Sequence, residues 1–140
     1  MSDLPLPYGT PLSLAHAKRV MQAAEAEADR NQWPMVIAIV DSTGHLLMLH
    51  RFDQAQYGSV LVAQQKAQTA LDFRRPTKVF EEAIANGGVG VRIVSMSNVI
   101  ALEGGLPIIV DGKIIGAIGV SGMQSGQDAQ VARAGLSALT

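Results

Sequence analysis

The stretch that most constrains this chain runs from residue 104 to residue 122 and reads GGLPIIVDGKIIGAIGVSG. Apolar runs lead into and out of the dipeptide Asp111–Gly112, the two-residue loop that a type I′ turn requires, so the stretch predicts an antiparallel β-hairpin. Gly116 and Gly119 give up side-chain packing within the return strand. We interpret them as positions where another backbone segment, a crossing helix or a ligand approaches closely, or where the strand carries a bulge.

The composition indicates a single domain and excludes several classes of protein. The chain has 140 residues, of which 48% are hydrophobic, so it is long enough to bury its own core. Its net charge of −1 gives no electrostatic reason to expect nucleic acid or an anionic membrane as a partner. The absence of cysteine excludes disulfides, thiolate nucleophiles and cysteine-based metal sites.

Two further properties predict where the chain resides and how it assembles. Its first residues lack the basic and apolar regions of a secretory signal, and no apolar run is long enough to span a bilayer, so we expect a cytoplasmic protein. Only 16% of the residues are charged, against about 25% in typical soluble domains. Apolar surface that charges do not cover favours contacts between copies, so we expect a homo-oligomer.

Periodicity and turn signals predict an α+β fold with a mainly antiparallel sheet. Residues 1–12 contain three prolines and a glycine and predict an irregular arm without regular hydrogen bonding, while residues 13–140 form one domain. Ser13 is the expected N-cap of the first helix, and Ser125 with Asp128 resembles a capping box for the last one. The expected elements, in chain order, are helix 14–30, strands 35–40 and 45–51, helices 59–73 and 77–85, extended segments 91–96 and 99–103, the hairpin, and helix 126–139.

Two histidines are candidate metal ligands. His16 lies on a narrow second face of the first helix, beside the expected core stripe. His50 alternates with the apolar residues Leu46 and Met48 and therefore points to the same side of its strand as they do. For both histidines the alternative is a structural role, with the imidazole bonded to solvent or to a neighbouring group.

Charged residues near the predicted elements are candidates for binding or catalysis. Lys66 lies at the edge of the core stripe of helix 59–73, where a lysine either extends its ammonium to solvent or, together with Arg51, clamps an anionic ligand. Glu103 stands at the mouth of the hairpin, where it is either a general base or a solvated residue at the end of a strand.

Several motifs, in this order along the chain, resemble the GlcG/HbpS family, which includes the C-terminal domain of PduO-type proteins. They are VDSTG at 40–44, Arg51, Lys66–Ala67 with Thr69–Ala70, GGLP at 104–107, Asp111–Gly112, GAIGVSG at 116–122 and Gln127–Asp128. The resemblance covers residues 13–139. It implies a profilin-like, three-layer α/β/α fold with a five-stranded, mainly antiparallel sheet, and assembly into dimers or larger rings. It also implies haem binding through a histidine for some members and a place beside catabolic enzymes for many others. Lys66 and Asp128 match recurrent polar positions of its pattern.

The first functional hypothesis is a haem- or tetrapyrrole-binding or sensing protein that holds its ligand near a subunit contact. His16 or His50 would be the axial ligand, and Arg51, Lys66 or another cation would bind the propionates. Two alternatives stay open, namely a small catabolic enzyme that acts on an organic acid, and an accessory subunit without a small-molecule site.

The enzyme alternative would be an isomerase, a tautomerase or a lyase. Arg51 and Lys66 would bind the substrate carboxylate, and Glu103, His50 or Asp128 would move a proton. Backbone N–H groups would stabilise an enolate-like oxygen. The glycine-rich positions expected to line such a ligand site are Gly104, Gly105, Gly119, Ser121 and Gly122.

Overall fold

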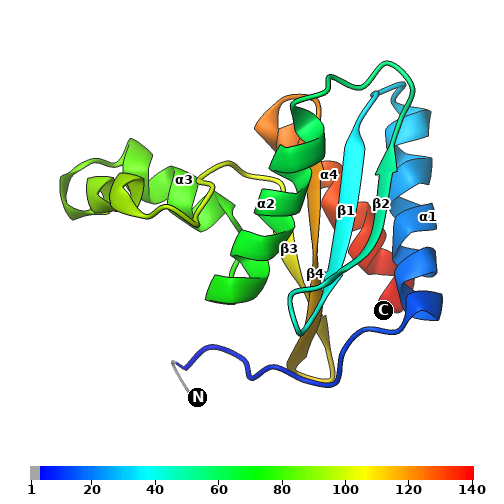
Figure 1. Ribbon diagram of the computed structural model, residues 1–140, viewed down its shortest axis with the longest axis horizontal. Coiled ribbons are helices and arrows are strands. Elements are labelled where there is room, and N and C mark those ends of the chain that lie inside the picture. The colour runs from blue at the N-terminus through cyan, green and yellow to red at the C-terminus, as the bar shows by residue number, and fades with distance from the viewer. Residues whose placement is uncertain (1–3) are drawn as a thin grey trace.

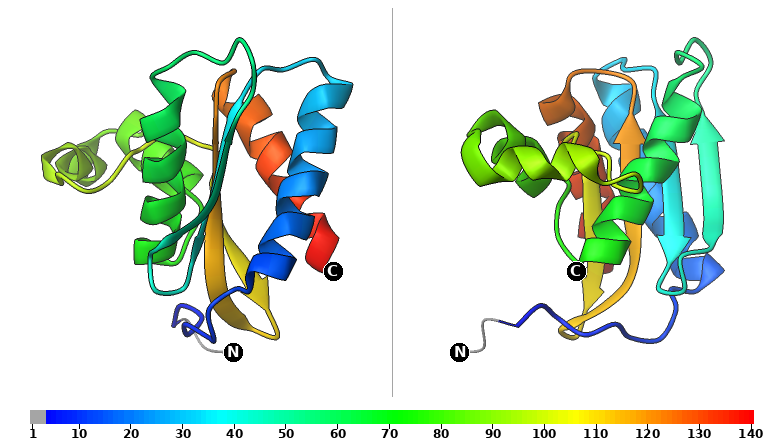
Figure 2. Two further views of the ribbon diagram at one scale, coloured as in Figure 1. Left: turned by 45° about the vertical axis from the view of Figure 1, so that its right-hand side comes forward. Right: turned by 60° about the vertical axis from the view of Figure 1, so that its left-hand side comes forward.

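The computed structural model describes residues 4–140 as an antiparallel sheet with helices on both faces (Figure 1). The sheet has the strand order β2-β1-β4-β3. Figure 2 shows α2 on one face of the sheet and α1 with α4 on the other. The elements in chain order are α1 (Leu14–Arg30), β1 (Val36–Asp41), β2 (Leu46–Arg51), α2 (Ser59–Phe73), α3 (Lys78–Ala85), the 3-10 helix η1 (Gly88–Ser95), β3 (Gly105–Val110), β4 (Lys113–Ser121), α4 (Ser125–Leu136) and the 3-10 helix η2 (Ser137–Leu139). The prediction of a mixed fold with an antiparallel sheet is confirmed.

Strand β1 is the centre of the sheet and of the core. It pairs antiparallel with β2 on one side and with β4 on the other. Residues 35–40 are continuously apolar and all buried, as a strand covered on both faces requires. Strand β2 is an edge strand, and its side chains are exposed or only partly buried. Its residues are therefore free to line surface grooves.

The main helices begin and end close to the predicted positions. The hydroxyl of Ser13 accepts a hydrogen bond from the backbone N–H of His16 at 3.2 Å, so Ser13 caps α1 as expected. Helix α2 ends at Arg74, which adopts a left-handed conformation with φ 55°. No helix within residues 4–140 is both long enough and apolar enough to cross a membrane.

The predicted hairpin is the β3–β4 unit. Asp111 and Gly112 have φ values of 52° and 74°, and two consecutive positive φ angles are the signature of a type I′ turn. A register shift between Ile108 and Ile109 places a bulge next to Gly116. A Cβ atom on Gly119 would lie 2.0 Å from the carbonyl oxygen of Ala63, so this glycine lets α2 pack directly on β4. A Cβ atom on Gly116 would lie 2.4 Å from the carbonyl oxygen of Val40, so close approach of another backbone segment applies to both glycines, and the bulge lies beside Gly116.

The prediction of five strands is wrong, because the sheet has four strands. Residues 91–96 fall mostly within η1, and residues 99–103 form no strand. Two positive φ angles, 73° at Gly87 and 63° at Gly88, turn the chain so that η1 packs on α3. A Cβ on Gly90 would lie 2.1 Å from the carbonyl oxygen of Ala83, which shows how closely the two backbones approach. This local packing outweighs the β-propensity of the valines.

The N-terminal arm is irregular but is fixed to the hairpin by backbone hydrogen bonds. Ile114 N–H donates to the carbonyl of Pro7 at 2.9 Å, and Gly9 N–H donates to the carbonyl of Ile114 at 2.8 Å. Leu12 N–H donates to the carbonyl of Ile115 at 2.9 Å. The expectation of an arm without regular hydrogen bonding is therefore corrected for residues 7–12, while residues 1–3 lie outside the described part of the chain.

Candidate functional site

His16 lines a groove where the start of α1, the β3–β4 turn and the C-terminal residues meet. We call this the His16 groove, with a volume of about 440 Å³. Its walls are largely apolar, and it is lined by Thr10, Pro11, Leu12, Ser13, His16, Arg19, Val110, Ile115, Leu139 and Thr140. Within residues 4–140, no group forms a hydrogen bond or an ion pair with the His16 imidazole. Both ring nitrogens of His16 are therefore available to a ligand.

One cation accompanies His16 in this groove. Arg19 lies three residues after His16, so both side chains leave the same side of α1. Its Nη2 atom donates to the carbonyl of Ala138 at 2.7 Å, which holds the guanidinium against the C-terminal segment. The remaining N–H groups can bind an anion. Arg19 was not among the residues predicted from the sequence, although its spacing of three residues from His16 is the signal that identifies it.

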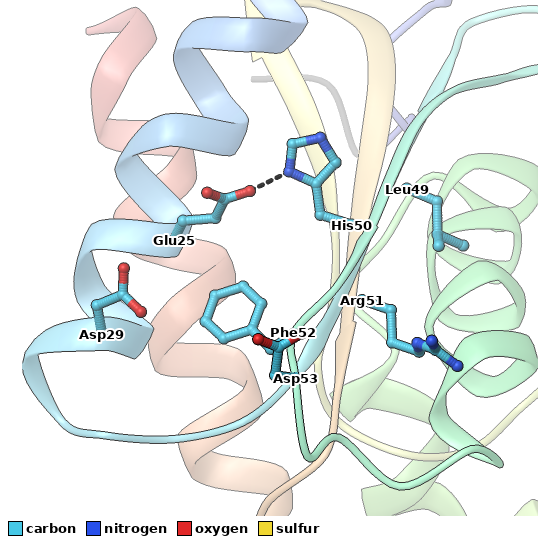
Figure 3. A pocket seen from close by; sticks show the side chains of 7 residues that line it. All are labelled: Glu25, Asp29, Leu49, His50, Arg51, Phe52 and Asp53. Carbon is cyan, nitrogen blue, oxygen red and sulfur yellow. Dashed lines mark hydrogen bonds and ion pairs between the residues drawn. The ribbon is translucent and has the colours of Figure 1, made fainter.

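His50 lines a different groove, between α1 and the end of β2 (Figure 3). We call this the His50 groove, with a volume of about 660 Å³. The Nδ1 atom of His50 forms a hydrogen bond with the carboxylate of Glu25 in α1. Asp29 and Asp53 also line this groove, so it contains three carboxylates. Arg51 is the one arginine in the lining, so the carboxylates outnumber it, and this excess of negative charge disfavours an anionic ligand.

Arg51 belongs to the same end of β2 but points away from His50, toward α2 (Figure 3). Its guanidinium lies 5.7 Å from the centre of the Tyr57 ring. Glu25, the partner of His50, was not among the residues predicted from the sequence. No local signal identifies that pair, because 25 residues separate its members.

Lys66 is buried in the core instead of reaching solvent, with only 2% of its surface exposed. Its Nζ atom lies 3.0 Å from Oδ2 of Asp128 and 2.9 Å from the carbonyl oxygen of Val120. A Cβ atom on Gly105 would lie 2.3 Å from the carbonyl oxygen of Lys66 and one on Gly104 would lie 2.8 Å from its Nζ atom, so the start of β3 packs directly on the lysine. The snorkelling interpretation is therefore wrong, and Lys66 and Arg51 do not form a clamp in this structure.

Asp128 is the buried partner of Lys66 and does not cap α4. Burial raises the pKa of its carboxyl group, and the Lys66 ammonium together with the N–H group of Met123 partly offsets that effect. The N–H group of Met123 donates to its Oδ1 atom at 3.0 Å. The cap of α4 is instead formed by Gln124 with Gln127, so the predicted Ser125 capping box is wrong. Oδ2 of Asp128 bonds to Lys66 and Oδ1 to the N–H group of Met123, whereas the Ser125 hydroxyl donates to Glu81, so Ser125 and Asp128 do not form a capping pair.

The remaining predicted ligand-binding positions lie along the packed ends of β3 and β4. Gly105 N–H donates to the hydroxyl of Thr77 at 2.9 Å, and the hydroxyl of Ser121 donates to that of Ser59 at 3.0 Å. The four glycines have no space for a side chain, because an added Cβ atom would lie 2.7 Å or less from a neighbouring atom at Gly104, Gly105, Gly119 and Gly122. Neither these positions nor the half-buried Glu103 lines a histidine groove. Their assignment to a ligand or catalytic site stays a prediction.

The described residues contain no cluster of three or more histidine, cysteine, aspartate or glutamate side chains that could hold a bare metal ion. A metal that is already bound within an organic ligand needs fewer side chains from the protein. Haem iron carries four porphyrin nitrogens, so one axial side chain, apolar walls and cations for the propionates are enough. The His16 groove contains one histidine, mainly apolar walls and one arginine, and these residues fit such a group.

Comparisons with known proteins agree with this fold. The protein-family model described as haem-degrading protein HbpS-like matches residues 12–137. Protein GlcG of Escherichia coli K12 is 44% identical over 110 residues, which cover 79% of this chain and 81% of GlcG.

Two solved structures are similar over nearly the whole chain. A double mutant of HbpS from Streptomyces reticuli has a TM-score of 0.85 and 30% identity, and the match covers 96% of this chain and 91% of that one. A complex of PduOC with haem has a TM-score of 0.84 and 27% identity, with 94% and 96% covered. The model match over residues 12–137 and the identity to GlcG show that this chain belongs to the HbpS-like family.

Proposed function

We propose that this chain binds haem or a related tetrapyrrole, as a carrier or a sensor, and that the His16 groove holds the macrocycle. One observation carries the proposal, namely the combination of a partner-free imidazole, apolar walls and Arg19 in one groove. The name of the matching family and the haem complex of PduOC support the ligand class. His16 would supply the axial nitrogen, the apolar walls would cover the macrocycle, and Arg19 would bind a propionate.

The charges of the two grooves favour His16 over His50 as the axial ligand. Haem carries two propionates, and the lining of the His50 groove contains three carboxylates against one arginine, Arg51. The carboxylates of the His50 groove repel the propionates of haem, whereas no carboxylate side chain lines the His16 groove. Nδ1 of His50 is also engaged by Glu25. Arg19 thus replaces Arg51 and Lys66 as the proposed cation for the propionates.

Assembly and location belong to the same proposal. The His16 groove is open to solvent on one chain, so a second copy would complete the cover over the macrocycle and place the ligand near a subunit contact. Large apolar side chains are exposed elsewhere on the surface, among them Leu61 and Tyr57. Such surface favours association of copies. We therefore propose a homo-oligomer. The location proposed for it is the cytoplasm, as the sequence led us to expect.

We expect His16→Ala to weaken haemin binding by at least about tenfold, because the axial bond to iron is lost while the walls of the groove stay in place. The measurement is a titration of the purified protein with haemin, followed by the Soret band. His50→Ala is the matched control, since it removes another exposed histidine and is expected to leave the affinity within about twofold of the parent. Iron-free protoporphyrin should bind His16→Ala and the parent equally. Equal haemin titrations for parent and His16→Ala would refute the assignment of His16.

A small catabolic enzyme that acts on an organic acid is the second candidate. The observation in its favour is the His50–Glu25 pair, because a carboxylate at Nδ1 orients a histidine that acts as a general base. His50 would then move a proton in an isomerase, tautomerase or lyase reaction. This candidate predicts that His50→Ala abolishes turnover of the acid while haemin has no saturable site.

A further inference from the structure

A third groove lies in the lobe that α3 and η1 form beside the sheet. Figures 1 and 2 show this lobe projecting from the body of the molecule on the side of α2. The groove has a volume of about 460 Å³, and its lining joins the end of α2 to both elements of the lobe. We call it the lobe groove, lined chiefly by Phe73, Arg75, Phe80, Arg92, Ile93 and Met96. Its volume lies within the range of small-molecule sites, roughly 300–1,000 Å³.

The floor of the lobe groove is apolar and aromatic. Phe73 and Phe80 meet edge to face, with ring centres 5.4 Å apart and an angle of 75° between the rings. Ile93 and Met96 extend this apolar surface onto η1 and the residue that follows it. The valines of η1 are largely exposed, with 71% of Val89 and 69% of Val94 accessible. Covering an exposed apolar surface of this kind with an apolar group lowers the free energy.

Two arginines at the same groove lack carboxylate partners. Nε of Arg75 donates to the carbonyl of Phe73 at 2.8 Å, and its guanidinium lies 6.0 Å from the centre of the Phe80 ring. Within residues 4–140, neither Arg75 nor Arg92 forms an ion pair. The carboxylates of α3 are engaged elsewhere, since Glu82 pairs with Lys78 and Glu81 accepts a hydrogen bond from Ser125.

No acidic side chain lines the lobe groove, so the positive charge of Arg75 and Arg92 is not neutralised within it. Guanidinium groups bind carboxylates through two parallel N–H···O bonds, and these charge-assisted bonds are stronger than neutral ones. We propose that the lobe groove binds an amphipathic carboxylate. The aliphatic or aromatic tail covers Phe73, Phe80 and Ile93, and the carboxylate pairs with Arg92 or Arg75.

The charges favour a carboxylate over a second copy of this chain as the occupant. In a two-fold symmetric contact the same surface meets itself. A contact centred on the lobe groove would then bring together four arginines, Arg75 and Arg92 of each copy, and no carboxylate in the groove would compensate their charges. The proposal is also independent of haem in the His16 groove, because no histidine lines the lobe groove.

Decanoate is the probe, with decan-1-ol as its uncharged counterpart. Backbone amide shifts of the isotope-labelled parent are followed during titration with each compound. We expect saturable shifts confined to residues 73–96 for decanoate, and about tenfold weaker binding of decan-1-ol because the charge-assisted bonds are lost. Arg92→Gln and Arg75→Gln should each weaken decanoate binding several-fold, and the double substitution should reduce it to the level of decan-1-ol.

Arg133→Gln is the matched control, since Arg133 is an exposed arginine on α4 that does not line the lobe groove. It should leave decanoate binding within about twofold of the parent. Haemin titrations of the Arg75 and Arg92 variants should equal that of the parent, so failure of the haem proposal would be visible separately. The proposal is overturned if decanoate causes no saturable shift in residues 73–96, or if decan-1-ol binds as tightly as decanoate. Sedimentation at the same protein concentrations shows whether the chain is a monomer or an oligomer. If decanoate binds the monomer but not the oligomer, a second copy occupies the groove in the oligomer, and the proposal is overturned.

Discussion

Lys66→Met is expected to lower the free energy of unfolding by about 3–5 kcal/mol, because it removes one partner of a buried ion pair. Both members of the pair are 2% exposed, and Nζ of Lys66 is bonded to Asp128 and to the carbonyl of Val120. Methionine fills a similar volume but leaves the Asp128 carboxylate and that carbonyl without the ammonium. Urea denaturation of the parent and the variant at pH 7 measures the difference.

A contrast between two lysines isolates the effect of burial. Lys78→Met removes an ion pair with Glu82 at 3.6 Å, in which both side chains are more than half exposed. Exposed pairs contribute about 0–1 kcal/mol, so this control should unfold close to the parent. The double variant Lys66→Met with Asp128→Leu removes both charges and should be more stable than Lys66→Met alone. A Lys66→Met loss below about 1 kcal/mol would contradict a structural role of the pair.

The destabilisation should also depend on pH. The pKa of Asp128 is raised from 3.8 by burial, and removal of the Lys66 charge raises it further. An acid whose pKa is raised in the folded state binds its proton more tightly there than in the unfolded chain. Its contribution to stability is therefore greatest below pH 3.8 and falls as the pH rises through the raised pKa. Lys66→Met should accordingly lose less stability at pH 4 than at pH 7.

Gly119→Ala is expected to destabilise the fold by more than about 4 kcal/mol or to prevent folding, because no space exists for a methyl group. The added Cβ would lie 2.0 Å from the carbonyl oxygen of Ala63 and 2.5 Å from the backbone nitrogen of Ala67. Both atoms belong to the backbone of α2, so no side-chain rotation relieves the overlap. The helix would have to move away from β4, and this movement would separate Lys66 on α2 from Asp128 on α4. Circular dichroism and urea denaturation measure the result.

Gly126→Ala is the matched control for Gly119→Ala. Gly126 lies in the first turn of α4, and no atom lies within 4 Å of a Cβ added there. Alanine forms helix better than glycine by about 0.5–1 kcal/mol, so this variant should be slightly more stable than the parent. If Gly119→Ala fails to fold, its low yield of soluble protein beside a normal yield of Gly126→Ala gives the same answer. A Gly119→Ala variant within 1 kcal/mol of the parent would disprove direct packing of α2 on β4.

Local sequence signals predicted most of the elements correctly. The Ser13 cap, the apolar run of residues 35–40 and the Asp111–Gly112 turn each depend on residues close together in the chain, and each lies where expected. The predictions failed where a local preference competed with packing. The valine-rich segment in residues 88–95 favours a strand by propensity, but its contact with α3 makes it a 3-10 helix.

The candidate site was less predictable than the fold. His16 and Arg19 are neighbours on one helix, so their proximity is visible in the sequence. Part of the apolar wall of their groove, Pro11 and Leu12, is also close in the chain, but Val110, Ile115 and Leu139 come from the hairpin and the C-terminal segment, more than 90 positions away. The His50–Glu25 pair joins a strand to a helix, and no periodicity within either element indicates it.

The sequence by itself determined the hairpin, the limits of the main helices, the central buried strand and the family, because these depend on local turn geometry, periodicity and motif order. Only the tertiary structure decided which polar residues are buried and which groups they contact. Lys66 and Asp128 are 62 positions apart, and their pairing follows from the approach of α2 to β4 that Gly119 permits. Whether a charged side chain reaches solvent, binds a ligand or neutralises another charge depends on what the fold places beside it, and that information is not local.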